Sequence, residues 1–211
     1  MRSAKWLSLG EEVAKLEAAG VDLLHFDASD GRFISELSGS IEAITAVKKI
    51  SKIPVEVHLM VERPELSIQK FIDAGVDTLI IHIEATPHTH RVLQEIKSAG
   101  RLAALSINPA TPFEMVRDVL HLADKISIMT VNPGVGGVLV ESTLPKVKQI
   151  SDYIKEKKLK TIVQVDGAVS LKTRDTFLKA GVTSFILGYP LFSRPDYSIG
   201  VKELRTGKPA K

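Results

Sequence analysis

Cysteine is absent from this chain of 211 residues, which excludes disulfide bonds, thiolate-bound zinc sites and a catalytic thiol. Aromatic residues make up only 5% of the chain and do not alternate with basic residues, which argues against a surface that stacks on nucleic-acid bases. Lysine and arginine are spread along the sequence without a basic block, and the net charge is only +3. The composition therefore predicts no nucleic-acid partner.

Long hydrophobic runs are missing too. No apolar stretch reaches the roughly 18 residues that a membrane-spanning helix needs. The N-terminus, MRSAKWLSLGEE, lacks the apolar centre of a signal peptide. We therefore expect a cytoplasmic protein with no membrane partner. The composition, 44% hydrophobic and 25% charged, is that of an ordinary globular protein, and the length favours a single domain over residues 1–211.

An internal repeat sets the expected architecture. Four stretches end a helix-like segment with Ala-Gly and then begin an apolar, β-rich run: EAAGVDLLHF (17–26), IDAGVDTLIIH (72–82), KSAGRLAALSI (97–107) and LKAGVTSFIL (178–187). The glycines occupy the position just after a helix, where the backbone turns left-handed. A repeat of helix, glycine and strand indicates βα units and a parallel sheet.

Seven β-rich runs alternate with eight helix-like segments. The strands are expected near residues 22–27, 54–60, 78–83, 102–107, 125–131, 161–166 and 183–187. The helices are expected near residues 7–19, 41–51, 64–74, 88–99, 112–121, 142–157, 170–180 and 197–205. The strand runs are continuously apolar, as in parallel strands covered on both faces. This pattern predicts an α/β fold, a (β/α)8 TIM barrel with a truncated first strand at the N-terminus. An open doubly wound sheet is the alternative.

Ionisable residues gather at the ends of these strands. His25 and Asp27 end the first predicted strand, His58 lies near the end of the second, and Asp166 ends the sixth. Residues two apart on a strand share a face, so His25 and Asp27 can both point into the mouth of a barrel. A single histidine at a strand end is more often structural. Two imidazoles and two carboxylates that converge, however, suit a divalent cation such as Zn²⁺, Fe²⁺ or Mn²⁺.

Glycine-rich segments follow the last three predicted strands. They are VNPGVGGVL (131–139), DGA (166–168) and LGY (187–189). A single glycine-rich loop is as often merely flexible. In barrels, however, backbone N–H groups in the loops after the last strands commonly bind phosphate, and glycine allows an anion to approach closely. The position of these segments therefore predicts a phosphate-binding site.

Taken together, these motifs resemble the ribulose-phosphate 3-epimerase family. The family pattern HxDxxDGxF is similar to HFDASDGRF in this chain. Further blocks follow in family order: VEVHLMVERPE, HIEAT, SINPATP, MTVNPGVGG, VDGA and LGYPLF. The similarity covers the chain from Leu9 to Phe192. It implies a (β/α)8 barrel, one bound divalent metal ion, a phosphorylated ketopentose substrate and a homo-oligomer.

The resemblance also implies roles for individual residues. The family's metal-ligand positions are occupied by His25, Asp27, His58 and Asp166. Asp27 and Asp166 would move the proton at C3, through an enediolate, as D-ribulose 5-phosphate and D-xylulose 5-phosphate interconvert. The implied substrate-binding residues are His58, Met60, Met129, Gly134, Val135, Gly136, Gly137, Gly167, Ala168, Gly188 and Tyr189.

The chain departs from the family pattern at some positions near the site. Ser29 stands where the family has a methionine, and Arg32 and Tyr189 also differ from the usual residues. A 3-epimerase of another ketose phosphate, such as allulose 6-phosphate, is therefore one alternative. A non-catalytic sugar-phosphate-binding paralogue is another. His82 matches a family strand-end position that is not a ligand, and we expect it to support the site or to pack in the core.

Overall fold

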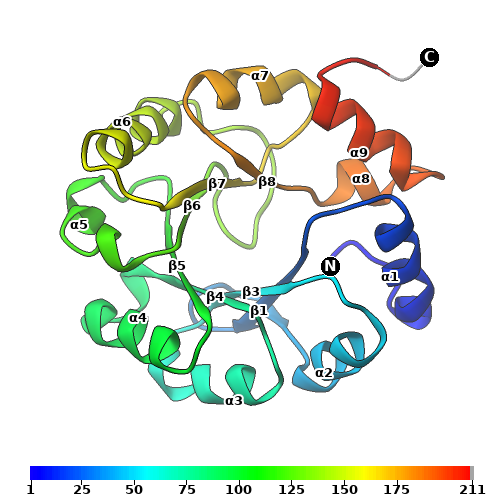
Figure 1. Ribbon diagram of the computed structural model, residues 1–211, viewed down its shortest axis with the longest axis horizontal. Helices are drawn as coiled ribbons and strands as arrows, with labels where there is room; N and C mark the ends of the chain where they lie inside the picture. The colour runs from blue at the N-terminus through cyan, green and yellow to red at the C-terminus, as the bar shows by residue number, and fades with distance from the viewer. Residues whose placement is uncertain (210–211) are drawn as a thin grey trace.

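The computed structural model describes residues 1–209 and shows an α/β fold with a curled sheet (Figure 1). The strands are β1 (Leu24–Asp30), β2 (Leu37–Ser38), β3 (Val55–Met60), β4 (Thr78–His82), β5 (Leu102–Ile107), β6 (Lys125–Met129), β7 (Ile162–Asp166) and β8 (Ser184–Ile186). They form one sheet in the order β2-β1-β3-β4-β5-β6-β7-β8. Only the short β2 is antiparallel to its neighbour, and the other strands pair in parallel.

Helices lie around the outside of the curled sheet (Figure 1). They are α1 (Leu9–Ala18), α2 (Ile41–Ile50), α3 (Ile68–Asp73), α4 (Thr89–Ser98), α5 (Glu114–Arg117), α6 (Thr143–Glu156), α7 (Leu171–Lys179), α8 (Tyr189–Phe192) and α9 (Tyr197–Thr206). Short 3-10 turns are η1 (Trp6–Ser8), η2 (Pro64–Leu66), η3 (Ile83–Ala85) and η4 (Leu120–Leu122). In α4, Val92, Leu93 and Ile96 recur at helical spacing and are completely buried, so this face packs on the sheet.

The seven expected strands are all present, but some boundaries were wrong. β1 continues to Asp30, so Asp27 lies within the strand instead of ending it. The strand is longer because Ser29 pairs with Met60 on one side and Ser38 on the other. The helix expected at residues 112–121 is divided into α5 and η4, and the one at residues 64–74 into η2 and α3.

The curled sheet confirms the α/β class, while closure into a barrel stays a prediction. Within residues 1–209, the hydrogen-bonded order ends at β2 on one side and at β8 on the other, and no strand pairing joins these two ends. In Figure 1 the helices lie on the outer face of the curled sheet. A doubly wound sheet, the alternative fold, would have helices on both faces. No helix in residues 1–209 has the length and apolar character needed to cross a membrane.

Alternation along the strands separates two environments. Val55, Val57 and Leu59 on β3 belong to the apolar core between the sheet and the helices. Because strand side chains alternate between faces, Glu56 and His58 point to the enclosed side of the sheet. The same strand thus contributes both to the packed core and to the polar interior.

The glycines after the helices have the left-handed backbone that the repeat predicted, and two of them form a matched test. Gly100 and Gly181 have φ values of +72° and +96°. A Cβ on Gly100 would meet nothing within 4 Å, whereas one on Gly181 would lie 2.0 Å from Oγ of Ser151. Ser151 is buried and has little room to move.

We expect Gly181→Ala to destabilise the protein more than Gly100→Ala. Both variants force alanine into a left-handed conformation, at a cost of about 1–2 kcal/mol. Only Gly181→Ala adds overpacking, which costs a further ~1–3 kcal/mol. Urea unfolding of the two variants measures the difference, and equal free energies of unfolding would contradict the close packing of Gly181 on α6.

Candidate active site

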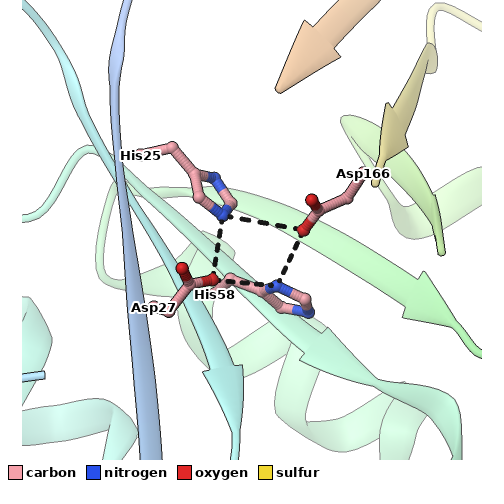
Figure 2. A group of neighbouring side chains, drawn as sticks. All are labelled: His25, Asp27, His58 and Asp166. Carbon is pink, nitrogen blue, oxygen red and sulfur yellow. Dashed lines mark hydrogen bonds and ion pairs between the residues drawn. The ribbon is translucent and has the colours of Figure 1, made fainter. Parts of the chain in front are cut away.

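Four ionisable side chains converge on the enclosed side of the sheet (Figure 2). His25 and Asp27 come from β1, His58 from β3 and Asp166 from β7. One oxygen of each aspartate faces both imidazoles. Oδ1 of Asp27 lies 3.3 Å from Nε2 of His25 and 3.6 Å from Nδ1 of His58. Oδ2 of Asp166 lies 3.9 Å and 3.4 Å from the same two nitrogens. We call these four residues the His/Asp cluster.

The His/Asp cluster fits a divalent cation. One nitrogen or oxygen from each residue lies within 4.8 Å of those of the other three. Nδ1 of His58 is buried, faces the two carboxylates and has no hydrogen-bond partner. A nitrogen lone pair left without a donor in a buried site is what a cation would complete. Two imidazoles and two carboxylates are a donor set that suits zinc, iron or manganese.

His82 determines which nitrogen of His58 faces the cluster. The two rings stack with centroids 4.9 Å apart, and their Nε2 atoms lie 2.8 Å from each other. On its other side, Nδ1 of His82 lies 3.0 Å from Oε2 of Glu84. A carboxylate only accepts, so neutral His82 donates Nδ1–H to Glu84 and accepts Nε2–H from His58. In neutral His58 the lone pair is then on Nδ1, directed at the cluster.

Burial and neighbouring charges shift the pKa values of the histidines in opposite directions. Burial, together with the nearby His58, lowers the pKa of His82 to about 4. Burial also acts to lower the pKa of His25, but the carboxylates of Asp27 and Glu56 outweigh it and raise that pKa to about 10. Burial acts to raise the pKa of Asp27, but the hydrogen bond from His25 at 3.3 Å outweighs it and holds that pKa well below its usual range.

A cavity of about 1250 Å³ opens beside the His/Asp cluster. His58 is completely buried and does not line it. All the other residues that the sequence assigned to the site do line it: His25, Asp27, Met60, Met129, Gly134, Val135, Gly136, Gly137, Asp166, Gly167, Ala168, Gly188 and Tyr189. The glycine-rich loops and the cluster thus share one cavity, although the roles of individual residues stay predictions.

The DGA segment after β7 has a backbone that glycine alone accommodates at its centre. Gly167 has a φ of +99°, and a Cβ there would lie 2.4 Å from Cγ2 of Val131. The next residue, Ala168, also has a positive φ of 50°. The loop therefore folds tightly against the end of β6 and brings its backbone into the cavity wall.

The sequence interpretation missed a group of polar residues beneath the cluster. Glu56, Lys125 and Gln164 are buried, and Lys125 and Gln164 both donate hydrogen bonds to Glu56. The two-residue alternation of strand side chains could have indicated this group. Glu56 precedes His58 by two residues, and Gln164 precedes Asp166 by two, so each shares a face with a cluster residue.

Comparison with known proteins identifies the family. Residues 1–192 match the model of the ribulose-phosphate 3 epimerase family. The ribulose-phosphate 3-epimerase of Bacillus subtilis (strain 168) is 36% identical over 208 residues, which cover 98% of this chain and 96% of the relative. The protein of the same name from Escherichia coli (strain K12) is 34% identical over 206 residues, covering 97% and 92%.

The chain is therefore an epimerase, and it belongs to the ribulose-phosphate 3-epimerase family. Solved structures agree on the fold. A crystal structure of 3-hexulose-6-phosphate synthase has a TM-score of 0.70 and 18% sequence identity, covering 96% of this chain and 94% of that one. At that identity the similarity shows the fold alone.

The opposite pKa shifts predict two separate titrations in metal-free protein. His82 should titrate near pH 4 and His25 near pH 10, both away from the ordinary 6.5. Between pH 6.5 and 4 the unfolded chain binds the proton that His82 refuses, so stability falls as the pH falls. The stability from His25 is complete below pH 6.5 and is lost as the pH rises through 10. Each slope is at most about 1.4 kcal/mol per pH unit.

Nuclear magnetic resonance of the imidazole C–H protons across the pH range measures both values. Urea unfolding at the same pH values measures the slopes. Added Zn²⁺ should abolish the titration of His25, because the cation takes the place of its Nε2 proton. If both histidines titrated near pH 6.5, the buried contacts described for them would be wrong.

Proposed function

We propose that this epimerase interconverts D-ribulose 5-phosphate and D-xylulose 5-phosphate with a divalent cation. The observation that carries the proposal is the pair of carboxylates, Asp27 on β1 and Asp166 on β7, which approach the same two imidazoles from different strands. Membership of the family supports the reaction class. The cavity beside the cluster supports a substrate of small-molecule size.

Inversion at C3 needs two proton-transfer groups. One base removes the C3 proton from one face of the substrate, and one acid returns a proton to the other face. Each aspartate directs a single oxygen to the imidazoles, Oδ1 for Asp27 and Oδ2 for Asp166. The second oxygen of each carboxylate is left for proton transfer. Asp27 and Asp166 exchange the roles of acid and base between the two directions, with an enediolate of the substrate between the two transfers.

The His/Asp cluster would hold the cation through His25, Asp27, His58 and Asp166. A bound Zn²⁺, Fe²⁺ or Mn²⁺ supplies Lewis acidity, which lowers the pKa of the C3 proton beside the C2 carbonyl. Met60 and Met129 are both buried at 4% exposure beside the cavity. Their apolar side chains keep water from the intermediate and so limit its loss.

Backbone N–H groups bind the phosphate in this proposal. The segments that supply them follow β6, β7 and β8: Gly134 to Gly137, Gly167 with Ala168, and Gly188 with Tyr189. They line the same cavity as the carboxylates, so one substrate can contact both groups. We also infer that the curled sheet corresponds to a (β/α)8 barrel, in which the loops after the strands form the active site.

Protein stripped of metal and refilled with Zn²⁺, Mn²⁺ or Fe²⁺ should epimerise D-ribulose 5-phosphate, and Asp27→Asn or Asp166→Asn should lower kcat by about 10²–10⁴-fold. A coupled assay for D-xylulose 5-phosphate measures the rate. The control is Asp152→Asn, which should keep full activity. Asp152 is an exposed carboxylate on α6 that pairs with Lys148. D-allulose 6-phosphate assayed in parallel tests the sister reaction. Folded, metal-loaded protein inactive on both pentose phosphates would contradict the proposal.

Deuterium exchange separates the two proton-transfer groups. In D₂O, each single Asn variant keeps one carboxylate and should exchange the C3 proton of one epimer without inverting it, and the two variants should act on opposite epimers. Metal content is measured on the same samples, because both aspartates also belong to the cluster. If both metal-loaded variants exchanged the C3 proton of the same epimer, the proposal that each carboxylate acts on a different face of the substrate would be contradicted.

A further inference from the structure

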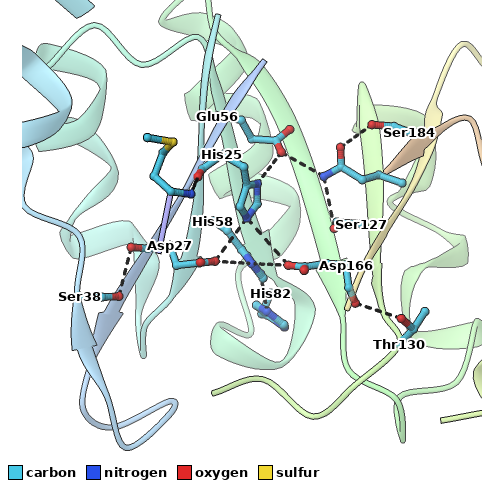
Figure 3. Close-up of polar contacts among 12 residues, drawn as sticks. His25, Asp27, Ser38, Glu56, His58, His82, Ser127, Thr130, Asp166 and Ser184 are labelled. Atoms are coloured by element: carbon cyan, nitrogen blue, oxygen red, sulfur yellow. Dashed lines mark hydrogen bonds and ion pairs between the residues drawn. The ribbon is translucent and has the colours of Figure 1, made fainter. Parts of the chain in front are cut away.

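A second polar group lies beneath the His/Asp cluster, toward the amino ends of the strands, since Glu56 and Gln164 precede His58 and Asp166 by two residues on β3 and β7. Its centre is the carboxylate of Glu56 on β3, which is only 1% exposed. Figure 3 shows this carboxylate beside His25, with Ser127 and Ser184 near the amide that contacts it. None of these residues has a part in the proton transfer proposed above. Their contacts nevertheless lead directly to one ligand of the cluster.

Three donors surround the Glu56 carboxylate. Its Oε1 lies 2.7 Å from Nδ1 of His25 and accepts a hydrogen bond of 3.1 Å from Nε2 of Gln164. Its Oε2 accepts a hydrogen bond from Nζ of Lys125, which is itself buried. Both oxygens of this buried carboxylate are thus satisfied, as a charge in such a place requires.

The direction of each hydrogen bond is fixed by chemistry. Ser184 donates to Oε1 of Gln164 over 2.8 Å, so the amide nitrogen of Gln164 must face Glu56. Lysine has only donors, and an ionised carboxylate only accepts. His25 therefore donates Nδ1–H to Glu56. The other nitrogen, Nε2, is left facing Asp27 at 3.3 Å and Asp166 at 3.9 Å.

We propose that Glu56 is the positioning residue of His25: it holds Nδ1–H, so that Nε2 presents its lone pair to the cation of the His/Asp cluster. Lys125 and Gln164 hold the carboxylate in turn. The inference rests on the cation of the proposed function. It explains the burial of a charged pair that contributes little to stability, since apolar residues of similar volume commonly stabilise a core as well or better.

The decisive variant is Glu56→Leu combined with Lys125→Met, which removes the acceptor without leaving a buried ammonium unpaired. We expect it to bind Co²⁺ about 10–100-fold more weakly than the wild type, the usual effect of losing a group that orients a metal ligand. Titration of the Co²⁺ absorption bands measures the dissociation constant. Glu12→Gln is the matched control, because Glu12 is also a completely buried carboxylate, but it contacts Tyr197 and Lys15. Its Co²⁺ affinity should equal that of the wild type.

A second variant keeps the test decisive if the first fails to fold. Glu56→Gln with Lys125→Met preserves the shape and one acceptor oxygen, so its loss of affinity should be intermediate. A spectroscopic readout follows His25 itself. In Zn²⁺-loaded wild type, the Nδ1–H proton of His25 should exchange slowly with water. It should exchange faster in Glu56→Leu with Lys125→Met, or in Glu56→Gln with Lys125→Met if the first variant does not fold.

The outcomes separate this inference from the proposed function. One outcome would overturn the positioning role alone. In it, the wild type binds the cation and epimerises, but the Glu56 variants keep the Co²⁺ affinity and the Nδ1–H exchange rate of the wild type. Wild type that binds no divalent cation would overturn both. Weaker affinity in the Glu56 variants, with the Glu12→Gln control unchanged, supports the inference.

Discussion

Repulsion between two largely buried carboxylates is the constraint that the rest of this site satisfies. Asp27 and Asp166 are each only 17% exposed and contribute oxygens within 4.8 Å of one another. Like charges at that separation repel by about 3 kcal/mol even at an effective dielectric constant of 20. His25 and His58 each lie within 3.9 Å of both oxygens, so the imidazoles, and any cation bound among them, compensate the charge that the aspartates bring. The proton transfer that we propose at C3 would use these two carboxylates together, and the imidazoles make their proximity tolerable.

The two imidazoles reach the cluster in different ways, and each is held from behind. His25 directs Nε2 to the carboxylates while its Nδ1 contacts Glu56. His58 directs Nδ1 while its Nε2 contacts His82. On these two parallel neighbours, His58 is level with Asp27, whereas His25 is level with Glu56, two residues earlier, so the two rings approach the carboxylates from different levels. A ring that is hydrogen-bonded on one nitrogen loses rotational freedom, so the other nitrogen is already in place for a ligand.

Much of this arrangement is readable from the sequence, because the strand period assigns faces. The four Ala-Gly repeats, together with the apolar runs between them, predicted the seven parallel strands. The period of two placed His25 with Asp27 on one strand. What the sequence could not give is contact across the enclosed interior. Glu56 and Lys125 are 69 residues apart and lie on strands that are not neighbours in the sheet, so only the curvature of the sheet brings them together. The extension of β1 to Asp30 was missed for a related reason, since the pairing with β2 depends on a loop return that has no strong local signal.

Stability and chemistry occupy opposite faces of the same strands. On β3, Val57 and Leu59 are completely buried against the helices, and each such side chain contributes about 1.5–3 kcal/mol by leaving water. Glu56 and His58 face inward, where a buried ion pair adds little net stability compared with apolar packing. Because the outer face supplies the folding free energy, the inner face can hold groups that a core selected for stability alone would exclude. The constraint on the inner face is geometric: every buried donor and acceptor needs a partner. Within residues 1–209, Nδ1 of His58 is one of five buried side-chain atoms that have no hydrogen-bond partner, and it lies where a cation would complete the site.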